Sequence, residues 1–205
     1  MLLPASLTTD RIANLIECPP ANVARYWPVI EQCLEPPAFG LNSQECAIAA
    51  LATVAVETAR RFAAIDEFGN DEYFTHMYDV KGSRPAVAIS MGNTEPGDGI
   101  KYHGRGLVQI TWKLNYQHYG QLIGCDLVTH PEVAKELNAS CAILAAYFYG
   151  HRIHGTGIGD AARSKNWVLV RKLVNGGTNG LDDFLKYVNR LEGVLAARST
   201  SSAGA

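Results

Sequence analysis

An apolar run that ends in a carboxylate most constrains the fold of this chain. Apolar residues recur at helical spacing through residues 47–56, a stretch without a single charged residue, and Glu57 follows directly. A helix that is apolar on nearly every side is stable only when other elements cover it. We therefore expect a helix that begins near Asn42, with Glu45 as its capping partner, and lies in a helical core.

Further helices are expected along the rest of the chain. Pro131 is predicted to start one helix. Ser164 is predicted to start another, which stops at the Asn-Gly-Gly of residues 175–177, and Asp182 lies in the first turn of the last. Residues 107–112, which follow the Gly-Arg-Gly of residues 104–106, are expected to form a short strand or a turn that leads into a helix. These patterns predict a mainly α architecture with at most a small β element. A length of 205 residues, 47% of them hydrophobic, fits a single domain over residues 1–198, with residues 199–205 as a frayed tail.

Charge and cysteine content narrow the classes of function. The net charge of -2 shows no basic excess, which argues against a nucleic-acid partner. The longest stretch without charged residues, 137–151, is too short for a membrane span. Residues 1–7 lack the pattern of a secretory signal. The five cysteines are odd in number and show no C-x-x-C spacing, so we expect free thiols and synthesis in the cytoplasm.

Acidic residues gather between Glu57 and Asp98, and they suggest glycoside hydrolysis. That reaction uses one protonated and one ionised carboxyl group in unlike environments. Glu57, after its apolar run, suits the protonated role, and Glu67 or Asp66 suits the ionised one. A structural alternative is that Glu57 only ends its helix and pairs with the arginine at 60 or 61.

Longer motifs carry a family resemblance. Glu57 is followed by Phe62 and Glu67, then by the segment 93–111, which reads NTEPGDGIKYHGRGLVQIT, and later by the sequence VNGG at residues 174–177. Order and spacing over roughly residues 25 to 195 resemble glycoside hydrolase family nineteen, which includes chitinases and phage endolysins. The resemblance implies a two-lobed, lysozyme-like α fold with a central cleft.

The resemblance also implies roles for individual residues. Glu57 matches the general acid, Glu67 the general base, and Thr111 the residue that helps to hold the attacking water. The family inverts the anomeric centre without metal or cofactor, which suits carboxyl groups ~6.5–9.5 Å apart. The residues expected to bind the sugar chain are Tyr102, Arg105, Gln109, Asn115, Tyr116 and Asn175. Three aromatic residues that flank or belong to the motif are candidates for stacking on sugars, namely Tyr102, Trp112 and Tyr116.

Some positions depart from the family pattern. Val56 stands where many members have histidine, and Phe184 stands where many have an arginine that organises the catalytic carboxylates. Residues 59–61 make the segment after Glu57 one residue longer, so Asp66 rivals Glu67 as the base.

The resemblance predicts an endolysin-type enzyme, a monomer that cleaves the β-1,4 bonds of bacterial peptidoglycan and lyses the host. It would be made in the host cytoplasm and released through a membrane pore. The alternative is a chitinase that acts on chitin or chito-oligosaccharides, and a third possibility is a saccharide-binding protein without catalysis. His151 and His154 lie three residues apart but have no further ligand pattern, so no metal site is expected.

Overall fold

The computed structural model describes residues 1–36 and 39–201 and confirms the mainly α fold class. The strands are only two residues long. The chain divides into two compact units. Unit 1 comprises Met1–Ala63 and Tyr147–Ala205, and unit 2 comprises Ala64–Ala146. None of the helices in the described residues is long and apolar enough to cross a membrane.

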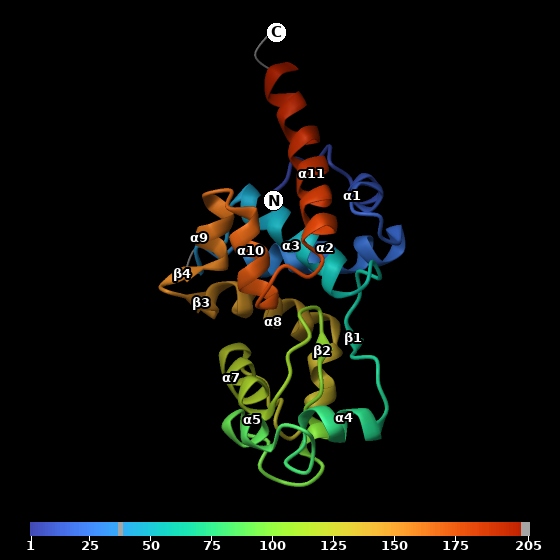
Figure 1. Ribbon diagram of the computed structural model, residues 1–205. Coiled ribbons are helices and arrows are strands. Elements are labelled where there is room, and N and C mark those ends of the chain that lie inside the picture. Colours follow the sequence, from blue (N-terminus) through green and yellow to red (C-terminus); the bar gives the residue numbers. More distant parts are fainter. Residues whose placement is uncertain (37–38, 202–205) are drawn as a thin grey trace. The chain divides into compact units, whose positions relative to one another are not determined.

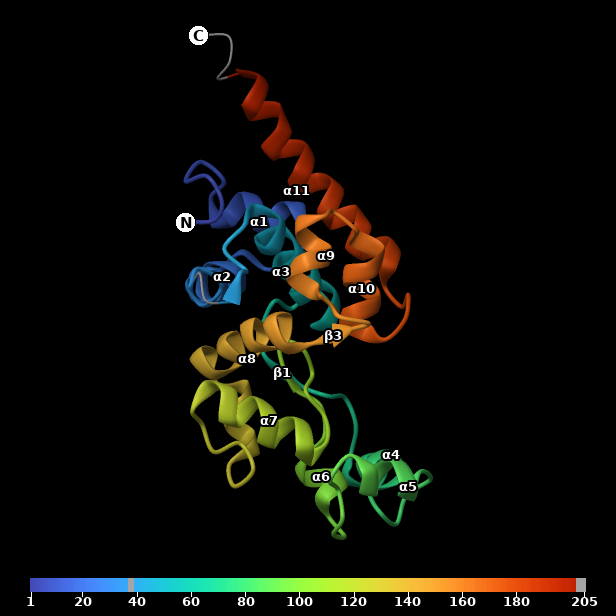
Figure 2. The ribbon, with the colours of Figure 1, turned by 90° about the vertical axis from the view of Figure 1, so that its left-hand side faces the viewer.

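Unit 1 is built around one central helix, α3 (Gln44–Glu57), which contacts α2, α9, α10 and α11 (Figures 1 and 2). Every residue of α3 from Cys46 to Ala55 is buried, which confirms the prediction from the apolar run. The cap is Ser43 rather than Asn42, because the Ser43 hydroxyl accepts the N–H of Cys46 at 3.2 Å. The other elements of unit 1 are α1 (Thr9–Leu15), α2 (Pro20–Leu34), β3 (Arg152–Ile153), β4 (Thr156–Gly157), α9 (Ile158–Arg163), α10 (Trp167–Asn175) and α11 (Leu181–Ser201).

The last two helices of unit 1 follow their capping residues. Helix α10 begins at Trp167 rather than at Ser164, because the side chain of Asn166 accepts the N–H of Leu169. It ends at Gly176, whose left-handed backbone suits glycine, as the sequence predicts. Helix α11 extends to Ser201, and residues 202–205 of the expected tail lie outside the described part.

Unit 2 holds a short antiparallel pair of strands, β1 (Ile65–Asp66) and β2 (Arg105–Gly106), in which Asp66 lies opposite Arg105. This pair places the segment around Glu67 beside the glycine-rich motif. The helix expected at Pro131 is only a 3-10 turn, and α8 begins at Leu137. The other elements are α4 (Asp71–Tyr78), α5 (Pro85–Ser90), α6 (Asp98–Lys101), α7 (Lys113–Ile123) and the 3-10 helix η2 (Pro131–Lys135), with α8 (Leu137–Gly150) crossing into unit 1.

Candidate active site

Glu57 is the last residue of α3, and the chain is fixed directly after it. The buried Thr58 hydroxyl donates to the Val54 carbonyl at 2.6 Å and accepts the N–H of Phe62 at 2.9 Å. Phe62 is fully buried in spite of its left-handed backbone, with φ 49°. The apolar core therefore holds a turn that is otherwise costly, and this turn ends the helix at Glu57.

The Glu57 carboxylate forms an ion pair with Arg171 of α10. The Arg171 side chain is only 3% exposed and that of Glu57 is 17% exposed. Arg171 also donates from Nε to the carbonyl of Asn179 at 2.7 Å. Of the two alternative pairings, with Arg60 or with Arg61, the one with Arg60 is not made, because Arg60 lies 3.8 Å from Glu17 instead. Glu57 thus has a buried cation beside it, not only apolar neighbours.

Phe184, the departure from the family pattern on α11, is fully buried. It packs on the same apolar stripe as Val188 and Leu191, which are also buried. An aromatic ring carries no charge, so this position supplies core packing and no cation to a carboxylate.

Glu67 lies in unit 2, directly after β1, and neutral groups donate to its carboxylate. Oε1 accepts from the Tyr78 hydroxyl at 2.6 Å and from the Tyr73 hydroxyl at 3.3 Å, and Oε2 accepts the N–H of Gly104 at 3.0 Å. Burial, and next the hydrogen bond to Glu67, raise the pKa of the Tyr78 phenol well above its usual value.

Gly104 leaves room for this close approach. A Cβ on Gly104 would lie 3.0 Å from Oε2 of Glu67 and 3.2 Å from Oε1 of Gln109. The backbone of Glu67 is fixed as well, since its N–H donates to the Gly104 carbonyl at 2.8 Å. The glycine in the motif therefore lets the backbone hold the carboxylate directly.

Asp66, the rival of Glu67, lies beside two cations, Lys135 and Arg105, and beside His103. Its carboxylate pairs with Lys135, with Nε of Arg105 at 3.1 Å and with Nε2 of His103 at 3.3 Å. Partial burial acts to raise the pKa of Asp66, but the hydrogen bond and charge of Lys135, with His103 and Arg105, hold it below its usual value. Asp66 thus serves as the anion of a charge cluster.

Two of the predicted sugar-binding aromatics belong to the core of unit 2. Tyr102 and Tyr116 are 1% and 0% exposed, and their hydroxyls donate to the carbonyls of Val128 at 3.0 Å and of His103 at 2.7 Å. Neither ring has a free face, so the expectation that they stack on sugars is wrong. Trp112 is half-buried and meets Tyr78 edge to face, with ring centroids 5.0 Å apart.

The predicted polar residues of unit 2 are tied into its backbone. Gln109 donates from Nε2 to the carbonyls of Ile65 at 3.1 Å and Gly106 at 2.9 Å, so both of its amide hydrogens are used within the chain. The Thr111 hydroxyl lies 3.1 Å from the Gln109 carbonyl, and Asn115 donates to the Thr111 carbonyl at 2.7 Å.

The remaining two predicted residues differ in exposure. Arg105 is held by Asp66, by the Lys101 carbonyl at 2.8 Å and by the Tyr116 hydroxyl at 2.9 Å, which makes it part of the framework. Asn175 is exposed at the end of α10 in unit 1, where it is open to a ligand.

Sequence reasoning missed Arg171, Tyr73 and Tyr78. The signal for Arg171 was present, because it lies four residues after Trp167 on the otherwise buried face of α10. A charge on an apolar face requires a partner. The two tyrosines showed no comparable signal, since their positions relative to Glu67 depend on how α4 folds back.

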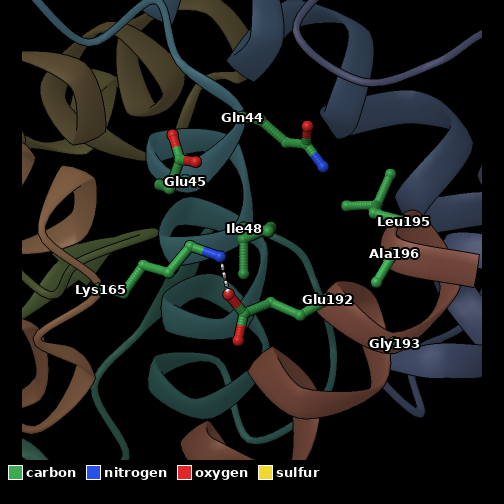
Figure 3. A pocket seen from close by; sticks show the side chains of 8 residues that line it. All are labelled: Gln44, Glu45, Ile48, Lys165, Glu192, Gly193, Leu195 and Ala196. Atoms are coloured by element: carbon green, nitrogen blue, oxygen red, sulfur yellow. Dashed lines mark ion pairs between the residues drawn. The ribbon is translucent and has the colours of Figure 1, made fainter. Parts of the chain in front are cut away.

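The described residues contain no group of three or more potential metal ligands. The His151 ring stacks on Tyr147, with centroids 4.9 Å apart. A hollow of about 610 Å³ does occur in unit 1, between the start of α3 and α11, where Lys165 pairs with Glu192 at 2.8 Å (Figure 3). Neither Glu57 nor Asn175 lines it.

Comparison with known proteins identifies the family. The profile of the family described as chitinase class I matches residues 12–153, so this chain belongs to glycoside hydrolase family 19. A family 19 domain-containing protein of Haemophilus influenzae is 35% identical over 52% of this chain and 48% of its own length. Chitinase 10 of rice is 32% identical over 38% of this chain and 32% of its own length. The chain thus spans less than half of these curated relatives.

Solved structures agree on the fold. Chitinase C from Streptomyces griseus superposes with a TM-score of 0.62 at 20% identity, over 91% of this chain and 76% of its own. At that identity the likeness concerns the fold alone.

Proposed function

We propose that this protein hydrolyses β-1,4 bonds in polymers of N-acetylglucosamine, with chitin and chito-oligosaccharides as its substrate class. The observation that carries the proposal is membership of family 19 over residues 12–153, a match that includes both Glu57 and Glu67. Chitinases among the curated relatives favour chitin over the peptidoglycan that the resemblance to endolysins suggests.

In the proposed reaction Glu57 gives its proton to the glycosidic oxygen while the bond from that oxygen to C1 breaks. Glu67 takes a proton from a water as the water oxygen bonds to C1 from the opposite face. The products are a free hydroxyl on one sugar and an inverted anomeric carbon on the other. Hydrogen bonds from the Tyr78 hydroxyl and the Gly104 N–H support the role of Glu67, because they orient its carboxylate without a cation.

Thr111 is proposed to help hold the attacking water. Its hydroxyl lies 3.1 Å from the Gln109 carbonyl, which orients the oxygen and leaves it able to accept. Asn175, exposed at the end of α10, is proposed to bind the sugar chain.

Peptidoglycan is the second candidate substrate, because it contains β-1,4 bonds between related amino sugars. The observation that favours it is the state of four cysteines, Cys18, Cys33, Cys46 and Cys125, which are free thiols. Free thiols fit folding in a reducing compartment, as expected of an endolysin made in a host cytoplasm.

The test uses purified protein with chitohexaose and, separately, with isolated Gram-negative peptidoglycan. Glu57→Gln keeps the shape of the side chain but removes the proton donor, so turnover is expected to fall by about 10²–10⁴-fold or more. Lys165→Gln, which removes a charge from the pair with Glu192 in Figure 3, is the matched control and should keep full turnover. Products from chitohexaose alone support the chitinase, and products from peptidoglycan alone support the endolysin. Sugar binding without turnover by the native protein contradicts both.

A further inference from the structure

Arg171 is a buried charge in an apolar part of unit 1. It follows the buried Val170 on α10, and its side chain is 3% exposed. A guanidinium in such surroundings is costly unless anions and hydrogen-bond acceptors satisfy it. The structure supplies both, since Nη1 meets the Glu57 carboxylate and Nε donates to the Asn179 carbonyl at 2.7 Å.

The loop between α10 and α11 encloses this guanidinium. Gly180 has φ +69°, and a Cβ there would lie 2.7 Å from Cγ1 of Val56 and 3.3 Å from Nη2 of Arg171. Only a residue without a side chain fits between the end of α3 and the guanidinium. The loop therefore brings a backbone carbonyl and a close glycine contact to the same cation, which restricts its movement.

Contacts of Arg171 with Glu57 are selective for one oxygen. The ion pair involves Oε1 of Glu57. A protonated carboxyl has one carbonyl oxygen, which accepts hydrogen bonds, and one hydroxyl, which donates. A guanidinium can only donate, so the oxygen that it engages is the carbonyl oxygen of the acid. The transferable proton then resides on Oε2.

We propose that Arg171 is the positioning residue for Glu57, fixing Oε1 so that Oε2 carries the proton that is given to the glycosidic oxygen. This inference rests on the proposed function, in which Glu57 is the general acid. Phe184 on α11 is buried and uncharged, so it cannot pair with Glu57, and the cation beside Glu57 comes from α10 instead. Arg171 does not touch the sugar in this account, and it acts only through Glu57.

The first experiment compares Arg171→Met with the native protein on chitohexaose. Misplacement of a reacting group by about 1 Å can cost 10²-fold, so kcat should fall by about 100-fold while KM changes little. Arg171→Lys keeps the charge but cannot span Glu57 and the Asn179 carbonyl as a planar fork, and its kcat should lie between the two. If Arg171→Met does not fold, Arg171→Lys alone tests the inference. Lys165→Met removes a cation from the pair in Figure 3 and should leave kcat unchanged.

Two further measurements separate positioning from a merely structural role. A dinitrophenyl glycoside of chitotriose, whose dinitrophenolate leaves without a proton, does not need the acid, so the losses in Glu57→Gln and in the Arg171 variants should both shrink on it. The double variant of Arg171→Met and Glu57→Gln should be no slower than Glu57→Gln alone, since residues that act as a unit are not additive.

Three results would overturn the inference. The Arg171 variants could keep the native kcat, they could lose the same factor in kcat on both substrates, or the losses in kcat could multiply in the double variant. Activity of Glu57→Gln tests the proposed function separately from the role of Arg171. If Glu57→Gln retains activity, Glu57 is not the acid, and both proposals fall together. If Glu57→Gln is inactive but both Arg171 variants work normally, only the role of Arg171 is lost.

Discussion

Asp66 and Glu67 are adjacent in sequence, yet their carboxylates meet different donors. Lysine, arginine and histidine side chains surround Asp66, whereas tyrosine hydroxyls and a backbone N–H bind Glu67. A base must accept a proton during the reaction, and neighbouring cations oppose that step. This difference favours Glu67 over Asp66, an assignment that the longer segment at residues 59–61 left open in the sequence.

Exchange of each carboxylate for its amide tests this assignment. Glu67→Gln should lower kcat by about 10²–10⁴-fold with little change in the melting temperature. Asp66→Asn should instead lower the melting temperature, because Lys135 and Arg105 lose their anion, while kcat stays within several-fold of the native value. Steady-state rates and thermal unfolding on the same preparations decide the matter. A greater loss of kcat in Asp66→Asn, at an unchanged melting temperature, would move the base to Asp66.

At the scale of elements, Glu17 links the turn after α1 to α11. Its carboxylate meets Nζ of Lys186 at 2.9 Å and Nη1 of Arg190 at 2.8 Å. The hydrogen bonds from Lys186 and then Arg190 lower the pKa of Glu17 to about 2. Because the folded value lies below the ordinary value of 4.5, the stabilisation is fully present above pH 4.5 and is lost as pH falls toward about 2.

Thermal unfolding of Glu17→Gln across pH checks this contribution. The variant should melt below the native protein at pH 7, and the difference should shrink steadily from pH 4.5 downward. Glu192→Gln removes the same charge from the pair with Lys165 alone, and should have a smaller effect at pH 7 (Figure 3). A difference that stays constant from pH 7 to pH 2.5 would show that the charge of Glu17 does not link these elements.

The sequence predicted elements well where one signal dominated. The apolar run at residues 47–56 identified α3, and Asn175 before two glycines identified the end of α10. The first residues of helices were less predictable. Asn42 and Ser43 are both good caps for α3, and only the backbone geometry selects Ser43. Pro131 starts a helical turn of either kind, so the pattern did not distinguish a 3-10 turn from the α-helix that begins at Leu137.

At the scale of the whole molecule, the family could be recognised from local motifs, but the side-chain environments could not. Tyr102 and Tyr116 show why, since an aromatic residue near a sugar-binding motif looks the same in sequence whether it packs inward or faces a ligand. Arg171 shows the converse, because its partner Glu57 is 114 residues away along the chain. Such pairs depend on how α3 and α10 pack.

This family 19 member is proposed to invert the anomeric centre in a single displacement by water. Proton NMR of the first products from chitohexaose, recorded before mutarotation, tests it most directly. Inversion of a β-1,4 bond predicts that the new reducing ends appear as the α anomer and drift toward equilibrium afterwards. New reducing ends that appear first as the β anomer would mean retention, and would contradict the roles proposed for Glu57 and Glu67.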